Sequence, residues 1–182
     1  MDLFQALNSF GSTSNNYGSL AATLIAALII FAFKEYIKKP KDFSGTFFIK
    51  TITTKSEYNP YVDMMIFHTV NLVSDGITIS GYSEKTGEIT KKGDIEYIGK
   101  NRSLGTVTGR IERNYLRPST LHLIIKEKGQ LRDYSISIKI PIKCRMQGTF
   151  YATAADSSGK AECRSEKFLE HPTKSSPRQF NY

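Results

Sequence analysis

Two residues of one segment, Arg132 and Tyr134, have the chemistry to bind an anion. They precede Ile136, Ile138 and Ile140 at alternate positions, and alternate residues of a β-strand share one face. We expect the isoleucine face to point inward, which places the arginine and the tyrosine near one end of a barrel. An inward guanidinium requires an anionic partner. The alternative is a structural salt bridge within the chain.

Catalytic motifs are absent from the sequence. It contains no GxSxG, HExxH or kinase-type set, and Asp94 stands where a phosphate-binding P-loop ending in Gly99-Lys100 would need glycine. His68, His122 and His171 are scattered, without metal-ligand spacing. We therefore expect no enzymatic activity, no metal and no cofactor.

Most of the chain after Pro40 reads as β-strands. Runs rich in Phe, Ile, Thr and Tyr recur about every ten residues, with turn signals such as Asp75-Gly76, Thr86-Gly87 and Ser158-Gly159 between them. Such strands indicate an antiparallel sandwich or barrel. A closed β-barrel of about eight strands, which leaves no exposed strand edge, is the expected fold. The expected strands are Phe43–Ile52, Tyr61–Val73, Gly76–Ser83, Ile95–Ile98, Gly105–Glu112, Thr120–Lys126, Tyr134–Ile140, Arg145–Thr153 and Ala161–Phe168.

An apolar run near the N-terminus predicts a membrane helix. Leu20–Phe33 is interrupted only by Thr23, and at 1.5 Å per residue it spans about 21 Å, short of the roughly 30 Å hydrocarbon core. Its uncharged flank extends it, so we expect a transmembrane helix over residues 17–37. A signal peptide and a buried core helix are the alternatives, but no positive residue precedes the run.

Charge sets the expected orientation. Residues 1–33 carry −1 and the remainder +9, and Lys34, Lys38, Lys39 and Lys41 follow the apolar run. The positive-inside rule then places the N-terminus outside and the large domain in the cytoplasm, as a single-pass membrane protein. The basic excess suggests an anionic partner or membrane surface, or ordinary solubility charge.

One face of the expected helix carries small residues. Gly18, Ala22 and Ala26 lie four apart, a spacing that lets helix backbones approach closely in lipid. We expect the helix to associate with copies of itself in a homo-oligomer. Before it, Leu3, Phe4, Leu7 and Phe10 recur at helical spacing and indicate a short interfacial helix.

The expected domain organisation combines these segments. It comprises an extracytoplasmic segment (1–16), the transmembrane helix (17–37), a basic linker (38–42), the barrel (43–168) and a disordered tail (169–182). Cys144 and Cys163 would be buried thiols in a reducing compartment.

The last third of the chain resembles a known family. The segments Gly109-Arg-Ile-Glu-Arg-Asn-Tyr-Leu116, Leu121-His-Leu-Ile-Ile-Lys-Glu-Lys-Gly129 and Met146-Gln-Gly-Thr-Phe-Tyr-Ala-Thr-Ala-Ala-Asp156 are similar to the transmembrane β-barrel effectors of bacterial cyclic-oligonucleotide (CBASS-type) antiphage signalling. Gly-Thr-Phe-Tyr is also similar to lipocalin-like barrels. Many members of the effector family have two membrane spans before the barrel, whereas this sequence has one.

The resemblance implies an antiviral defence effector. Its barrel would bind a cyclic or linear oligonucleotide signal, but no duplex nucleic acid, and its oligomeric membrane helices would disrupt the membrane or form an ion channel. A nucleotidyltransferase would supply the signal. Arginine would neutralise phosphate and tyrosine would stack on a base. The ligand-binding residues would be Arg132, Tyr134, Arg110, Tyr82 and Tyr151.

Two other functions remain open from the sequence. Because Arg110 alternates with Thr106 and Thr108, it could simply face solvent. The barrel could then be a membrane-tethered interaction module that binds a partner protein or anionic lipid. It could also be a lipocalin-like carrier of an apolar ligand, which a uniformly apolar interior would favour.

Overall fold

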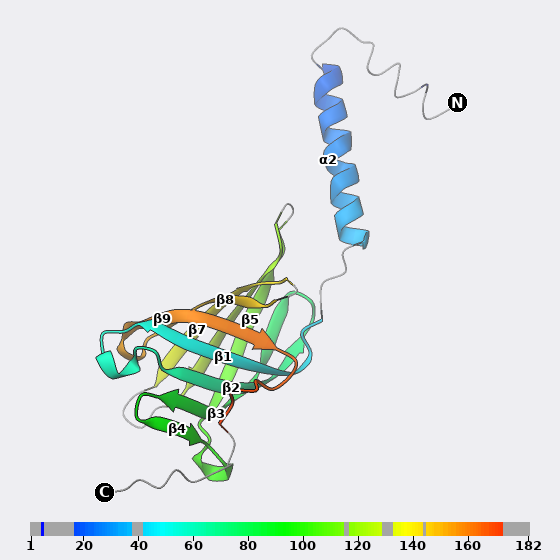
Figure 1. Cartoon of the computed structure of the whole chain (residues 1–182). Helices are drawn as coiled ribbons and strands as arrows, with labels where there is room; N and C mark the ends of the chain where they lie inside the picture. Colours follow the sequence, from blue (N-terminus) through cyan, green and yellow to red (C-terminus); the bar gives the residue numbers. More distant parts are fainter. Residues whose placement is uncertain are drawn as a thin grey trace, which may run out of the picture. The chain divides into compact units, whose positions relative to one another are not determined.

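The computed structural model describes residues 5, 17–37, 42–114, 117–128, 133–143 and 145–172. The chain forms two compact units, Met1–Pro40 and Lys41–Tyr182. Helix α2 (Tyr17–Ile37) belongs to the first unit, and the strands belong to the second (Figure 1).

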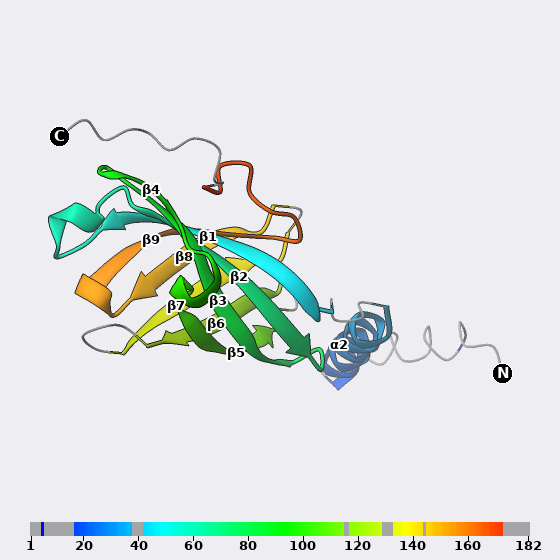
Figure 2. The same ribbon diagram turned by 90° about the horizontal axis from the view of Figure 1, so that it is seen from below.

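A closed antiparallel barrel makes up the second unit. Strands follow the chain around it, because the sheet order is β2-β1-β9-β8-β7-β6-β5-β3 and an additional β2–β3 pairing closes the ring (Figure 2). The strands are β1 (Gly45–Lys55), β2 (Met65–Ser74), β3 (Thr78–Thr90), β4 (Gly93–Glu96), β5 (Leu104–Glu112), β6 (Thr120–Glu127), β7 (Tyr134–Pro141), β8 (Gln147–Ala152) and β9 (Ser157–Arg164). The barrel has eight strands, since β4 pairs only with the end of β3. The expected barrel is thus confirmed.

Alternating side chains fill the barrel. Ile136, Ile138 and Ile140 of β7 are 0 to 3% exposed, whereas Ser137 and Lys139 between them are exposed. This confirms the inward isoleucine face. Aliphatic side chains from the other seven strands complete the core, and Cys163 lies within it.

The two ends of the barrel carry different connections. We call the end where β1 starts the base; it carries the β2–β3 turn and the loops β5–β6 and β7–β8. We call the opposite end the mouth. It carries the connections after β1, β3, β6 and β8, including the short 3-10 helices Asn59–Tyr61, Gly99–Asn101 and Ala154–Asp156.

Several strand boundaries and two predicted turns differ from the expectation. Tyr61 lies in a 3-10 helix, so β2 starts later than predicted. Thr86-Gly87, which is predicted as a turn, lies inside the continuous strand β3. The pairing of β3 with β2 shifts its register there, between Phe67 and His68 of β2. Ser158-Gly159, also predicted as a turn, lies inside β9. By contrast, Asp75-Gly76 is a turn, where the Asp75 carboxylate accepts hydrogen bonds from two backbone N–H groups.

Helix α2 covers the range over which the sequence predicts a membrane span. Its consecutive side chains Leu28, Ile29 and Ile30 are each about 60% exposed, so apolar surface is not confined to one side of the helix. Within the described residues, however, no helix has both the length and the apolar character needed to cross a membrane.

The segment after β9 lies on the outer wall of the barrel (Figure 2). Phe168 is 3% exposed against Phe67 of β2, and His171 is 6% exposed beside the same ring. Residues 169–172, which the sequence assigns to a disordered tail, therefore include a buried histidine. Residues 173–182 lie outside the described residues.

Candidate functional site

A groove on the outer wall of the barrel brings two of the expected ligand-binding residues together. It has a volume of about 690 Å³ and is lined by strands β5 to β8, within the range typical of small-molecule sites. Arg110 of β5 and Tyr151 of β8 both line it. Arg110 points outward, as its alternation with the buried Val107 side of the strand predicts.

Strand register places three basic side chains in one row across this groove. Arg110 is directly opposite His122 on β6, and His122 is directly opposite Lys139 on β7. Neighbouring strands lie about 4.8 Å apart, so the backbones at Arg110 and Lys139 are about 10 Å apart. Glu112 contributes a carboxylate beside this row, with Oε2 at 2.8 Å from Nε2 of His122. The remaining arginine and lysine make the groove attractive to anions.

The Tyr151 ring is held at the edge of the groove. Its hydroxyl donates a hydrogen bond to Oδ1 of Asp156 at 2.6 Å, and this bond raises the pKa of the tyrosine. The side chain is 46% exposed. A fixed, half-exposed aromatic face that lines the same groove as two cations can stack on a planar ring whose phosphates contact the cations.

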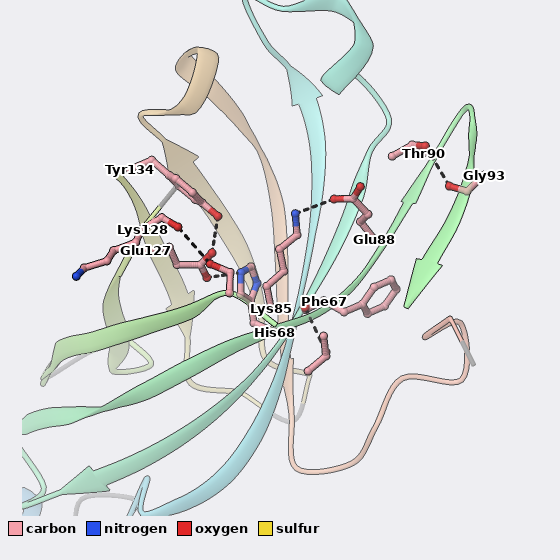
Figure 3. Close-up of polar contacts among 11 residues, drawn as sticks. Phe67, His68, Lys85, Glu88, Thr90, Gly93, Glu127, Lys128 and Tyr134 are labelled. Carbon is pink, nitrogen blue, oxygen red and sulfur yellow. Dashed lines mark hydrogen bonds and ion pairs between the residues drawn. The ribbon is translucent and has the colours of Figure 1, made fainter. Parts of the chain in front are cut away.

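A second polar cluster lies inside the barrel near its mouth (Figure 3). Nε2 of His68 on β2 is 2.8 Å from Oε1 of Glu127 on β6, and both side chains are at most 1% exposed. Their alignment falls outside hydrogen-bond geometry, so the two atoms are close neighbours without a hydrogen bond. The Tyr134 hydroxyl donates a short hydrogen bond to the other Glu127 oxygen.

Gly105 makes this contact across the barrel interior possible. Strand β5 lies between β3 and β6, and a Cβ at Gly105 would lie 2.6 Å from Oγ of Ser83 and 2.8 Å from Cγ of Glu127. Both distances are shorter than any van der Waals contact. The missing side chain therefore leaves the space that the Glu127 side chain fills.

Lys85 adds a cation to the cluster. Its Nζ lies 2.7 Å from Oε2 of Glu88 and 5.1 Å from the centre of the Tyr97 ring. Both charged side chains are only about one sixth exposed. Glu88 is therefore part of an ion pair at the barrel mouth.

The surroundings shift three pKa values in this cluster. Burial alone would raise the pKa of Glu127, but the contacts with His68 and Tyr134 lower it on balance. Burial and the neighbouring Glu127 carboxylate raise the pKa of Tyr134, which keeps its hydroxyl protonated as a donor. Burial opposes the charge of Lys85, yet the bond to Glu88 outweighs it and raises its pKa.

Charge separates the two clusters. The cluster inside the mouth holds two carboxylates against one lysine before His68 is counted, so a phosphate placed there would meet net repulsion. The outer groove holds an arginine and a lysine, and the two carboxylates beside it are already bound, Glu112 to His122 and Asp156 to Tyr151. Of the two, the groove is the candidate site for an anionic ligand.

The five expected ligand-binding residues do not form one site. Arg110 and Tyr151 meet in the groove. Tyr82 is 70% exposed on the outer side of β3, opposite Thr106, and does not line the groove. Tyr134 faces the interior and is bound to Glu127. Arg132 lies outside the described residues.

Sequence reasoning missed the residues that complete both clusters. Glu127 lies in phase with the buried Leu121, Leu123 and Ile125, so a charged residue on the apolar face of a strand was the available signal. His68 lies in phase with Val70 of β2 in the same way. Lys139 carried no such signal, because an exposed lysine is common on any strand.

The small residues Gly18, Ala22 and Ala26 lie on α2 at the expected spacing of four. Among the described residues, no three His, Cys, Asp or Glu side chains gather into a metal-binding group. No family model, curated protein or solved structure matches the chain.

Proposed function

We propose that the protein is a membrane-attached effector whose barrel binds a nucleotide signal in the groove between β5 and β8. The observation that carries this proposal is the meeting of Arg110, Lys139 and Tyr151 around one groove of about 690 Å³. Two cations whose backbones are about 10 Å apart suit a ligand with separated phosphates. The tyrosine suits a base, as in proteins that bind single-stranded nucleic acid.

Helix α2 is the proposed membrane-attached element. Leu20, Leu24 and Leu28 are 56 to 64% exposed, and burying such side chains in lipid is favourable by about 25 cal/mol per Å². Ligand binding would alter the association of several barrels and so of their helices. In an antiphage effector of the CBASS type, this change would permeabilise the bacterial inner membrane.

The apolar-carrier function is less well supported. A uniformly apolar barrel interior would favour it, whereas His68 and Glu127 lie inside this barrel and are almost fully buried. An apolar ligand near the mouth would have to leave these polar groups without solvent or partner.

Titration calorimetry on the full chain tests the groove. Cyclic and linear di- and trinucleotides serve as ligands, and inorganic phosphate and adenosine serve as controls. Arg110→Ala and Lys139→Ala should each weaken binding about tenfold, the effect of losing about 1.4 kcal/mol. Lys55→Ala, on an exposed lysine at the end of β1, should not. Equal affinity of Arg110→Ala and Lys55→Ala would exclude the groove, and Arg132→Ala in the same series tests the arginine that the sequence suggests.

Dye-loaded vesicles test the output. The full chain should co-float with vesicles and release the dye only when the nucleotide is added, and Arg110→Ala should release little. Protease accessibility of the N-terminus measures whether α2 crosses the bilayer or lies in one leaflet. Dye release without nucleotide, at an unchanged rate in Arg110→Ala, would separate any membrane activity from the barrel.

A further inference from the structure

The base of the barrel carries a cluster of exposed cations on two adjacent loops. Arg117 belongs to the loop β5–β6, and Lys143 and Arg145 belong to the loop β7–β8. All three side chains are exposed. We call these three residues the basal cluster.

The strands and one loop contact place the two loops side by side. Thr120 at the start of β6 pairs with Pro141 at the end of β7. The backbone N–H of Ile142 then donates a 2.7 Å hydrogen bond to the carbonyl of Ser119. Within the first loop, the Asn114 side chain donates to the carbonyl of Pro118. The cations are therefore presented together by braced loops.

Three carboxylates at the base have partners outside the basal cluster. Glu112 is bound to His122 on the outer wall. Asp75 accepts two backbone hydrogen bonds in the β2–β3 turn, and Asp42 accepts one from Ser44 at the start of β1. The two loops themselves hold no acidic residue among their described positions, so the basal cluster keeps a net positive charge.

The connection from α2 to β1 indicates which kind of surface the basal cluster contacts. Strand β1 starts at Gly45 on the base, only a few residues after α2 ends at Ile37. Lys38, Lys39 and Lys41 stand between them in the sequence. If α2 lies in lipid, the base is the end of the barrel that the chain brings nearest the bilayer, because n extended residues span at most about 3.5 Å × n.

We propose that the basal cluster docks the barrel, base first, on an anionic phospholipid surface. This inference rests on the proposed attachment of α2 to the membrane and adds an orientation to it. Each lysine or arginine near an anionic leaflet contributes about 1 kcal/mol, which is about fivefold in the docked-to-undocked ratio. Docking leaves the barrel mouth, at the opposite end, facing away from the bilayer.

Headgroup quenching of a fluorophore on the full chain tests this orientation. The fluorophore is attached through Ser119→Cys in a Cys144→Ser background, since Cys163 is only 3% exposed. A second preparation carries it through Lys92→Cys, in the exposed β3–β4 turn on the mouth side. The chain is bound to vesicles of phosphatidylcholine alone or mixed with phosphatidylglycerol, each containing a headgroup spin-label quencher.

Base-first docking predicts quenching at Ser119→Cys but not at Lys92→Cys, in anionic vesicles only and weakened by high salt. Arg117→Glu/Lys143→Glu should abolish it. Lys55→Glu/Lys100→Glu changes the net charge by the same amount, but at the mouth, and should preserve the quenching at Ser119→Cys. If the chain floats with vesicles but the two labels are quenched equally, or quenching is the same with and without phosphatidylglycerol, base-first docking is overturned while membrane attachment stands. If the chain does not float with vesicles, both base-first docking and membrane attachment are contradicted.

Discussion

Glu127 of β6 extends past the side-chain-free position of Gly105 on β5 and lies 2.8 Å from His68 on β2. The contact joins strands that are three places apart around the barrel. It also holds the Tyr134 hydroxyl, so three strands converge on one carboxylate (Figure 3). Such a group is costly to bury and more costly to leave without its partners.

Removing one partner of the buried contact should strongly destabilise the barrel. His68→Ala leaves the Glu127 carboxylate buried without the imidazole, and we expect a loss of about 3–5 kcal/mol in the free energy of unfolding. Urea titration followed by circular dichroism measures it.

The chain offers a matched control for this change. His122 and Glu112 lie at the same separation of 2.8 Å, but their side chains are 27% and 48% exposed. His122→Ala should therefore cost at most about 1 kcal/mol. Similar losses in the two variants would show that burial does not determine the strength of the His68 contact.

Gly105→Ala should also destabilise the barrel. The new methyl group would lie 2.7 Å from the backbone carbonyl of Lys126 as well as against Ser83 and Glu127. The carbonyl belongs to the β5–β6 ladder and cannot turn aside. We expect a loss of about 1–3 kcal/mol, measured by the same urea titration, while Thr106→Ala at the neighbouring exposed position should change little. Unaltered stability in Gly105→Ala would mean that the strand shifts to admit the methyl group.

The strands could be predicted because their period of two is local to the sequence. The structure has strands in all nine expected segments, although several boundaries shift. Gly87 shows where local reasoning fails. It does not adopt a positive φ and makes no turn; a Cβ there would lie 3.0 Å from Pro172. Its neighbour Thr86 contacts His171, a residue 85 positions away.

The candidate site could be predicted only in part for the same reason. Arg110 and Tyr151 were recognised by residue type, but their meeting depends on register across four strands. Lys139 enters the groove only through its pairing with His122. The contact between His68 and Glu127 depends on a glycine in an intervening strand, which no local pattern reveals.

Stability should fall in acid because of Glu127. Its folded-state pKa lies below the ordinary value of 4.5, so its contribution is fully present above about pH 4.5 and is lost as the pH falls through the lowered value. Glu127→Gln should lower stability at neutral pH and flatten the acid limb of the stability profile, measured by urea titration at a series of pH values. A wild-type acid limb retained in Glu127→Gln would assign acid unfolding to other carboxylates.

Lys85 should produce the opposite dependence in base. Its folded-state pKa lies above 10.5, so its contribution is present below that pH and is lost as the pH rises through the raised value. Tyr134, whose pKa is also raised, should not ionise with ordinary tyrosines near pH 10. Ultraviolet difference titration should therefore show the same tyrosinate amplitude near pH 10 in Tyr134→Phe as in the wild type. A smaller amplitude in the variant would contradict the short bond to Glu127.

Release of the segment after β9 should depend on the protonation of His171. Nε2 of His171 lies 2.9 Å from Oγ1 of Thr86, and Thr86 in turn donates to the backbone carbonyl of Phe67. Burial lowers the pKa of His171 below its ordinary value of 6.5. The docked segment is therefore fully stabilised above pH 6.5, and this stabilisation declines as the pH falls below it.

Limited proteolysis across this pH range measures the release. Lys167 lies in the segment and is exposed, and cleavage after it should accelerate as the pH falls from neutral toward 5 in the wild type. His171→Gln keeps an amide for Thr86 but cannot take up a proton in this range, so its cleavage rate should not rise. Phe168→Ala should cleave rapidly at every pH, because it removes the ring that packs against Phe67 and beneath Lys50. Equal pH dependence in the wild type and His171→Gln would place the titrating group elsewhere.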